Sequence, residues 1–368
     1  MIPVLRPTID EQTKKELLDV LDSGWWGNGP KVAEFEKKFA EYVGAKYAIA
    51  VNSATSALDL CLKAYDIKGG ELITTPMTFV SDAVVGEWNG MDVTFADINP
   101  RTLCIDPEKI ILTKETKAII AVDSHGRLAD IIGIRKSLAR QNVAPHRMPL
   151  IIEDAAHAMY VPGAGEHADI TVWSFQAVKT LPTGDGGMIT TNDEEIVKKI
   201  KSLLWLGVEK TTFERAHTKV YTWDYDINHG GQKSYMIDLT AVIGLGQLRR
   251  LEDMNERRRE IQDRYNEAFF GFTWFRLPEY THTVQYYTPE WADRDGLCEF
   301  LAENGIHTSV HFKPLNHMTY WKKAVKNPLP NTDKVWPNLL SLPVHSALTD
   351  EEQEYIIAKV KEFYAKAA

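Results

Sequence analysis

A lysine that follows an apolar strand is the residue of this chain whose setting most favours covalent chemistry. Lys179 stands five residues after the run Ile170–Ser174, and the glycine-rich turn Thr183–Met188 follows it. Most lysines are solvated surface charges. An ammonium held near an apolar site has a lowered pKa, however, so its neutral amine becomes available as a nucleophile. The setting therefore predicts that Lys179 is a nucleophile.

Two carboxylates end another apolar run, Leu150–Ile152. Glu153 and Asp154 follow the run directly, and His157 comes three residues later. In a parallel sheet, the carboxyl ends of the strands face the ligand crevice. A buried carboxylate needs a cation or hydrogen-bond donors, and a protonated pyridine nitrogen is such a cation. The alternative is an acid that only caps a following helix.

Small polar residues join a third apolar run to a helical pattern, in the segment Val51–Leu58. The free N–H groups at the start of a helix and the positive end of its dipole form an anion site, and small side chains allow a phosphate to approach. The alternative is that Ser53 or Thr55 simply serves as an N-cap.

The three segments together predict a pyridoxal 5'-phosphate (PLP) enzyme. An anion site, a carboxylate for a pyridinium and an imine-forming amine are the three features that PLP requires, and Lys179 would carry it as a Schiff base. A nicotinamide dehydrogenase is disfavoured because no Gly-x-Gly-x-x-Gly pattern follows the first strand.

The apolar and helical patterns alternate, which indicates βαβ units and a largely parallel sheet with helices on both faces. We expect helices over Glu11–Leu21 and Val32–Val43. The expected strands are Tyr47–Val51, Leu72–Thr75, Asp92–Ala96, Ala118–Val122, Leu150–Ile152, Ile170–Ser174 and Gly187–Thr191.

From about Gly244 the pattern changes to a long, half-exposed helix. It predicts a boundary between a large cofactor-binding domain, residues 1–244, and a small C-terminal α/β domain, residues 245–368. The elements expected in the smaller domain are a strand near Val284–Thr288, a helix over about Arg294–Asn304, a strand near Thr308–His311 and a terminal helix from Asp350.

Composition excludes several classes of function. The net charge of -9 gives no basic stripe, so we expect no nucleic-acid binding. The three cysteines form neither a disulfide framework nor a metal-ligand pattern, and we expect no metal. No apolar run approaches the length of a membrane span and no signal-peptide pattern begins the chain, so we expect a cytoplasmic protein.

The chain resembles the DegT/DnrJ/EryC1/StrS sugar aminotransferases, which are PLP enzymes of fold type I. The resemblance extends over nearly the whole length, and its most specific part is the segment SFQAVKTLPTGDGGM. It implies that Lys179 carries the cofactor and moves protons, that Asp154 pairs with the ring nitrogen, and that His157 binds the ring hydroxyl. It also implies that Phe79 stacks on the ring and that Ala54, Thr55 and Ser174 hold the phosphate.

Contacts from a partner subunit are implied as well. In the family a residue just before a Met-x-Asp segment reaches the phosphate of the neighbouring subunit in a homodimer. Here that region departs from the usual pattern and reads Gly230–Met236, so Lys233 or Asn228 is the expected contact. The alternative is an exposed loop with a solvated lysine. Trp26 and His311 are the expected substrate contacts.

The resemblance implies transfer of an amino group, from L-glutamate through the pyridoxamine form (PMP), to a keto group of a nucleotide-linked sugar for polysaccharide or glycoside synthesis. One rival is a sugar dehydratase of the same family, which carries histidine where Lys179 stands. Another is a non-catalytic binding or regulatory protein on this fold, which would not need to keep the nucleophile.

Overall fold

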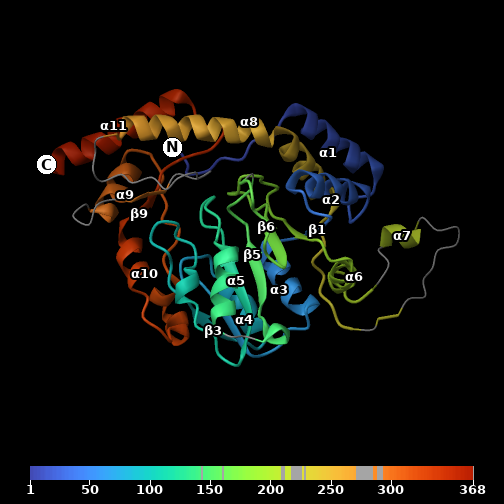
Figure 1. Ribbon diagram of the computed structural model, residues 1–368. Coiled ribbons are helices and arrows are strands. Elements are labelled where there is room, and N and C mark those ends of the chain that lie inside the picture. Colours follow the sequence, from blue (N-terminus) through green and yellow to red (C-terminus); the bar gives the residue numbers. More distant parts are fainter. Residues whose placement is uncertain are drawn as a thin grey trace.

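A seven-stranded sheet forms the centre of the larger lobe (Figure 1). The computed structural model describes residues 1–141, 144–159, 161–208, 212–216, 226–227, 229–270, 285–287 and 293–367. The strand order is β1-β7-β6-β5-β4-β2-β3. β7 runs antiparallel to both of its neighbours, and the other strands run parallel to one another. The strands are β1 (Tyr47–Val51), β2 (Glu71–Thr74), β3 (Asp92–Phe95), β4 (Thr116–Val122), β5 (Leu150–Asp154), β6 (Ile170–Ser174) and β7 (Gly187–Thr191).

Helices cover both faces of this sheet, as the alternation of patterns predicts. In β1, Ile49 and Val51 lie in the core that α3 and α6 close, whereas Ala48 and Ala50 face α2 and α8. This alternation follows from the two-residue period of a strand. The helical elements of this lobe are α1 (Glu11–Ser23), α2 (Pro30–Val43), α3 (Ala54–Ala64), α4 (Ser81–Trp88), η1 (Pro107–Lys109), α5 (Ile131–Arg140), η2 (Pro145–Arg147), α6 (Glu194–Leu203), α7 (Thr212–Ala216) and the start of α8 (Asp238–Ala268).

The helix α8 joins the two lobes. It crosses the top of Figure 1 from α1 and α2 to the C-terminal helices. The expected long helix is confirmed, but it begins six residues before Gly244, at Asp238, whose Oδ1 accepts a hydrogen bond from the Val32 amide at 3.0 Å. The expected domain boundary at 244/245 falls inside this continuous helix.

The smaller lobe contains a two-stranded antiparallel sheet and its own apolar core. The expected strand over Thr308–His311 is wrong, because only Ser309 pairs, with Ser341, the last residue of a three-residue strand. The N-terminus also belongs to this lobe, since Ile2 pairs with Ile306. The C-terminal elements are β8 (Gln285–Tyr287), α9 (Arg294–Glu303), η3 (Leu315–His317), η4 (Thr319–Ala324), α10 (Pro330–Val335), η5 (Trp336–Asn338), β9 (Leu339–Ser341) and α11 (Asp350–Ala367). Of these, η3 and η4 pack through Leu315 and Trp321 on the core of the larger lobe.

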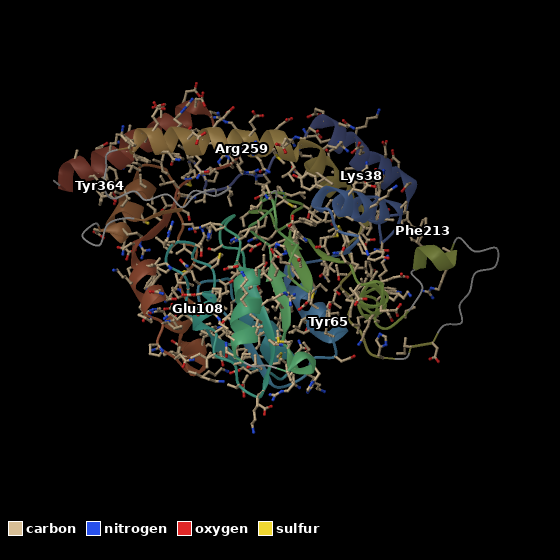
Figure 2. The ribbon with its side chains drawn as sticks, viewed as in Figure 1. Lys38, Tyr65, Glu108, Phe213, Arg259 and Tyr364 are labelled. Atoms are coloured by element: carbon tan, nitrogen blue, oxygen red, sulfur yellow. The ribbon has the colours of Figure 1, made fainter. Side chains whose placement is uncertain are left out.

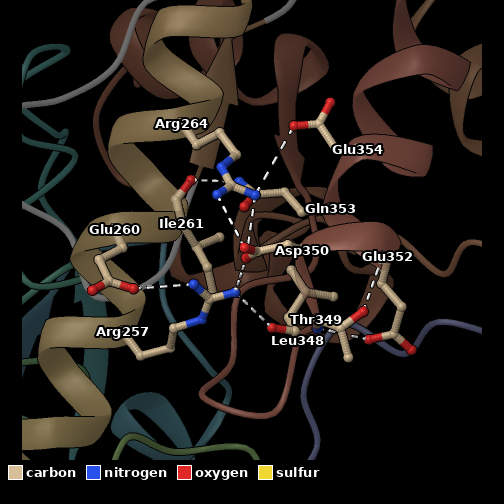
Figure 3. Close-up of polar contacts among 10 residues, drawn as sticks. All are labelled: Arg257, Glu260, Ile261, Arg264, Leu348, Thr349, Asp350, Glu352, Gln353 and Glu354. Carbon is tan, nitrogen blue, oxygen red and sulfur yellow. Dashed lines mark hydrogen bonds and ion pairs between the residues drawn. The ribbon is translucent and has the colours of Figure 1, made fainter.

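Ion pairs and one buried hydrogen bond fasten α11 to α8 (Figure 3). Arg257 and Arg264 of α8 both donate to the carboxylate of Asp350, at 2.6 and 3.2 Å. The buried Gln353 amide donates to the carbonyl of Ile261 at 2.7 Å. In Figure 2, Arg259 marks α8 and Tyr364 marks α11. Across the described ranges, no helix is long and apolar enough to cross a membrane.

Candidate active site

Lys179 and His157 meet at the carboxyl edge of the parallel strands. β6 ends at Ser174 and leads to Lys179, while β5 ends at Asp154 and leads to His157. Because the carboxyl ends of parallel strands share one edge of a sheet, the two loops lie together. Lys179 Nζ lies 2.6 Å from His157 Nε2.

Burial lowers the pKa of Lys179 to about 8, and the charges of Asp154 and Asp82 oppose this shift only in part. A substantial fraction of the amine is therefore neutral near physiological pH, as a nucleophile requires. The pKa of His157 lies well below its usual value, first because of burial and then because of the Lys179 charge. His157 is thus neutral, so it can accept a hydrogen bond from the Lys179 ammonium or donate one to the neutral amine.

Asp154 is a buried acid, 6% exposed. Its Oδ1 accepts a hydrogen bond from the Ala156 amide at 2.9 Å, and burial raises its pKa. The described residues between β5 and β6 form turns and bends, so Asp154 does not cap a helix there. Its position at the strand end suits a carboxylate that faces a ligand.

The N-terminus of α3 lies beside the starting residue of β7. Ser53 is the N-cap, with its Oγ accepting from the Ser56 amide at 3.1 Å, so the N-cap interpretation is correct for Ser53. Ala54 and Thr55 are the first helical residues. A Cβ on Gly187 would lie 2.8 Å from the Ala54 nitrogen, and Gly187 pairs with Ser174. The structure therefore brings the three expected phosphate contacts, Ala54, Thr55 and Ser174, to one place.

Histidine rings gather around His157, and sequence reasoning missed one of them. His125 follows β4, is 3% exposed, and lies 4.8 Å from His157 and 5.6 Å from His311 between ring centroids. Burial, followed by the charge of His157, lowers the pKa of His125 far below its usual value. The position of His125 just beyond the strand Ala118–Val122 is the signal that would have found it.

Aromatic rings border the same group. Phe312 stacks on His157, with ring centroids 5.7 Å apart and planes at 18°. Phe79, the expected stacking residue, is 58% exposed and lies 6.1 Å from Phe312. His311, an expected substrate contact, lies in this cluster, and burial lowers its pKa to about 4.

The other expected contacts lie elsewhere. Trp26 is 53% exposed and lines a separate cavity of about 510 Å³, whose lining does not include Lys179 or Asp154. Lys233 is exposed, with its ammonium 5.7 Å from the centroid of the Trp205 ring. Asn228 lies outside the described residues.

A larger cavity, of about 1090 Å³, lies at the opposite edge of the sheet. Its lining includes Thr116, Leu150 and Ile170, which begin β4, β5 and β6. Ligands of open parallel sheets bind at the carboxyl ends of the strands. This larger cavity is therefore not the site that Lys179 serves.

The donors and acceptors at the carboxyl edge fit PLP. Lys179 offers an amine, Asp154 an anion for a protonated ring nitrogen, and the start of α3 an anion site. His157 Nδ1 is buried and has no hydrogen-bond partner among the described residues, so it is available to a ligand. Gly187 keeps the start of α3 open, because a side chain there would collide with the backbone at Ser53 and Ala54.

Comparisons with known proteins agree with this chemistry. Residues 7–361 match the DegT/DnrJ/EryC1/StrS aminotransferase family. The spore coat polysaccharide biosynthesis protein SpsC of Bacillus subtilis is 37% identical over 382 residues, which cover 98% of this chain and 96% of SpsC.

Solved structures of sugar aminotransferases share the whole fold. The PMP form of the putative sugar aminotransferase Spr1654 of Streptococcus pneumoniae is 30% identical, with a TM-score of 0.92 and full coverage of both chains. CalS13 of Micromonospora echinospora is 27% identical, with a TM-score of 0.87, over 98% of this chain and 100% of its own. The chain therefore belongs to the DegT/DnrJ/EryC1/StrS aminotransferase family, and it is a PLP-dependent aminotransferase of fold type I.

Proposed function

We propose that Lys179 is the residue that carries PLP and that the site around it transfers an amino group to a sugar. The observation that carries this proposal is the position of the Lys179 amine, whose pKa is about 8, against the neutral ring of His157 and beside Asp154. When bound, PLP supplies an electron sink that stabilises negative charge on the carbon bearing the amino group.

The residues of this chain divide the remaining work. Lys179 Nζ accepts and returns protons, because its pKa lies close to working pH. Asp154 holds the ring nitrogen in its protonated form, and His157 binds the ring hydroxyl. Phe79 lies against the ring face once the site is filled. The contacts proposed for the phosphate are Ala54, Thr55 and Ser174, at the start of α3 and the end of β6.

The proposed substrates are L-glutamate as the amino donor and the keto group of a nucleotide-linked sugar as the acceptor. Similarity to SpsC, whose name places it in spore coat polysaccharide biosynthesis, supports a role in making surface polysaccharide or glycoside. His311 lies beside the Lys179 cluster and is a candidate for contact with the sugar. Trp26 is a candidate for contact with the sugar as well. Because it lines a separate cavity, it would contact a substrate bound in the site of the neighbouring subunit.

We further propose a homodimer in which Lys233, or Asn228, reaches the phosphate of the neighbouring subunit. The exposed position of Lys233 supports this arrangement, since its ammonium is available at the surface. The division into a large domain, residues 1–244, and a small domain, residues 245–368, remains part of the proposal, with α8 as the continuous connection.

Borohydride reduction of the PLP-loaded protein tests the central assignment. Reduction should fix the cofactor on Lys179, which peptide mass spectrometry would locate. Lys179→Ala should show no adduct and lose turnover, whereas the matched surface variant Lys117→Ala should behave like the wild type. An adduct on another lysine in the unsubstituted protein would contradict the proposal.

A further inference from the structure

A second buried carboxyl lies against Asp154, and none of the proposed roles uses it. Asp82 lies in the first turn of α4 and its side chain is 0% exposed. The hydroxyl of Thr78 donates a hydrogen bond to Asp82 Oδ2. Asp82 Oδ1 receives no donor from the described part of the chain. An acid in this position needs either a cation or its own proton.

The carboxyls of Asp82 and Asp154 lie close enough for each to affect the pKa of the other. Two ionised carboxylates cannot hydrogen-bond, because neither has a hydrogen to donate, and among the described residues Asp82 Oδ1 has no hydrogen-bond partner. One proton shared between the two acids would satisfy both, as in other buried pairs of acids.

The surroundings decide which acid keeps that proton. Asp154 accepts a second hydrogen bond, from the Ala156 amide, which favours its charged form. Burial raises the pKa of both acids, but that of Asp82 lies well above its usual value because burial and the Asp154 charge act together. The hydrogen bond from Asp82 and the charge of Lys179 favour the anion at Asp154.

We propose that Asp82 is a positioning residue: it keeps its proton on Oδ1, donates it in a hydrogen bond to Asp154, and so holds Asp154 as the anion that faces the ring nitrogen. The last part rests on the proposed role of Asp154. Such a bond would restrain the Asp154 side chain before the cofactor binds.

Other charged groups surround the pair. Lys179 attracts both carboxylates, and Asp123 forms a second buried acid pair with Glu153. A comparison of variants at position 82 alone keeps these groups constant. The charged groups that act on the pair are Lys179, which faces both acids, and Asp123, which feels the charge of Asp154.

Two substitutions separate the proton from the hydrogen bond. Asp82→Asn removes the titrating proton but keeps an N–H donor of nearly the same shape. Asp82→Leu removes both while keeping the same branched shape and number of side-chain heavy atoms. Neither variant has a titrating group at position 82, so either can be compared with the wild type in the cofactor-free measurement. If one variant folds poorly, the other is used for that comparison.

The cofactor-free protein tests the shared proton. An acid that stays protonated in the fold but ionises in the unfolded chain makes the protein less stable as pH rises above about 4. The melting temperature of Asp82→Asn minus that of the wild type should therefore increase between pH 5 and pH 8, by roughly 2 °C or more. A difference that stays constant over this range would overturn the proposal.

The loaded protein tests the positioning of Asp154. With ¹⁵N-labelled PLP, the ring nitrogen should keep its protonated chemical shift in the wild type and in Asp82→Asn, and move toward the unprotonated shift in Asp82→Leu. The dissociation constant for PLP should rise about tenfold in Asp82→Leu, as expected for the loss of a hydrogen bond to a charged group. Identical spectra for the Asn and Leu variants would refute the positioning role.

Asp154→Asn provides the control for the proposed function. If the ring nitrogen of PLP stays protonated in the Asp154→Asn variant, the role proposed for Asp154 is wrong. The melting experiment still decides whether Asp82 and Asp154 share a proton.

Discussion

The imidazole rings around Lys179 are neutral at working pH. Burial is the first cause of the lowered pKa of His125, His157 and His311, so these imidazoles remain uncharged near neutrality. Lys179 titrates close to pH 8. The lowered pKa makes these imidazoles weak bases, so Lys179 is the group of this cluster that exchanges protons near neutral pH.

The pKa of Lys179 gives a direct test in the cofactor-free protein. Competitive labelling with acetic anhydride reports the neutral fraction of each amine as pH increases. Lys179 should reach half of its maximal reactivity near pH 8, because its ammonium loses the proton there. The reactivity of a lysine in an unstructured model peptide should keep rising toward its ordinary pKa, about 10.4. A Lys179 curve that matches the curve of the model peptide would contradict the buried setting.

Asp154→Asn tests the charge beside the ring nitrogen. An amide cannot offset a pyridinium, so the ring should lose its proton and withdraw electrons less strongly. We expect the single-turnover rate with L-glutamate to fall roughly hundredfold or more, a typical effect of removing one preorganised electrostatic partner. Rapid-mixing absorbance measures this rate. A rate within a few-fold of the wild type would place the functional carboxylate elsewhere.

At the scale of elements, a capping box begins α11. Thr349 Oγ1 accepts from the Glu352 amide at 3.1 Å, and Glu352 Oε2 accepts from the Thr349 amide at 3.1 Å. Each bond satisfies a backbone donor at the helix start that would otherwise lack a partner.

Thr349→Ala removes one half of this box. We expect the free energy of unfolding to decrease by about 1 kcal/mol, the usual cost of losing an N-cap side chain. Urea denaturation of the cofactor-free protein measures it, and Thr349→Ser, which keeps the hydroxyl, should retain most of the stability. Equal losses in the Ala and Ser variants would show that the hydroxyl does not stabilise the helix.

The sequence predicts the strand ends of the large lobe well, because buried strands are continuous apolar runs that end at polar residues. This rule placed Asp154 and Lys179 at one edge, where the structure has them. The same rule applied to β4 would have found His125, three residues beyond Val122, whereas Asp82 lies in α4, well past the end of β2. A single sequence does not reveal that two acids face each other, because the contact joins the first turn of α4 to the end of β5.

In the small lobe, short elements escape this rule. β9 is three residues long and pairs with the distant β8, so its partner is not evident from local pattern. The segment over Thr308–His311 has the composition of a strand but meets β9 only at Ser341. Its backbone leads instead to His311 and Phe312, which border the Lys179 cluster.

At the scale of the whole molecule, α8 connects the lobe that holds Lys179 to the lobe that supplies His311 and Phe312. Both ends of the chain pack on the smaller lobe, through the pairing of Ile2 with Ile306 and through α11 (Figure 1). The Lys179 cluster thus draws on both lobes of one chain, and the proposed homodimer would add a contact from a second chain.

Mixing two defective subunits tests that homodimer. One subunit carries Lys179→Ala, and the other carries alanine at both Asn228 and Lys233; each alone should be inactive or weak. If sites are shared, each heterodimer contains one site with both defects and one site with neither. In a fully exchanged equal mixture, about one quarter of the sites should then be intact, and activity should return in that proportion. Subunit exchange is verified by native mass spectrometry. No recovery in an exchanged mixture would mean that each site is built from one chain, with Lys233 as a solvated surface charge.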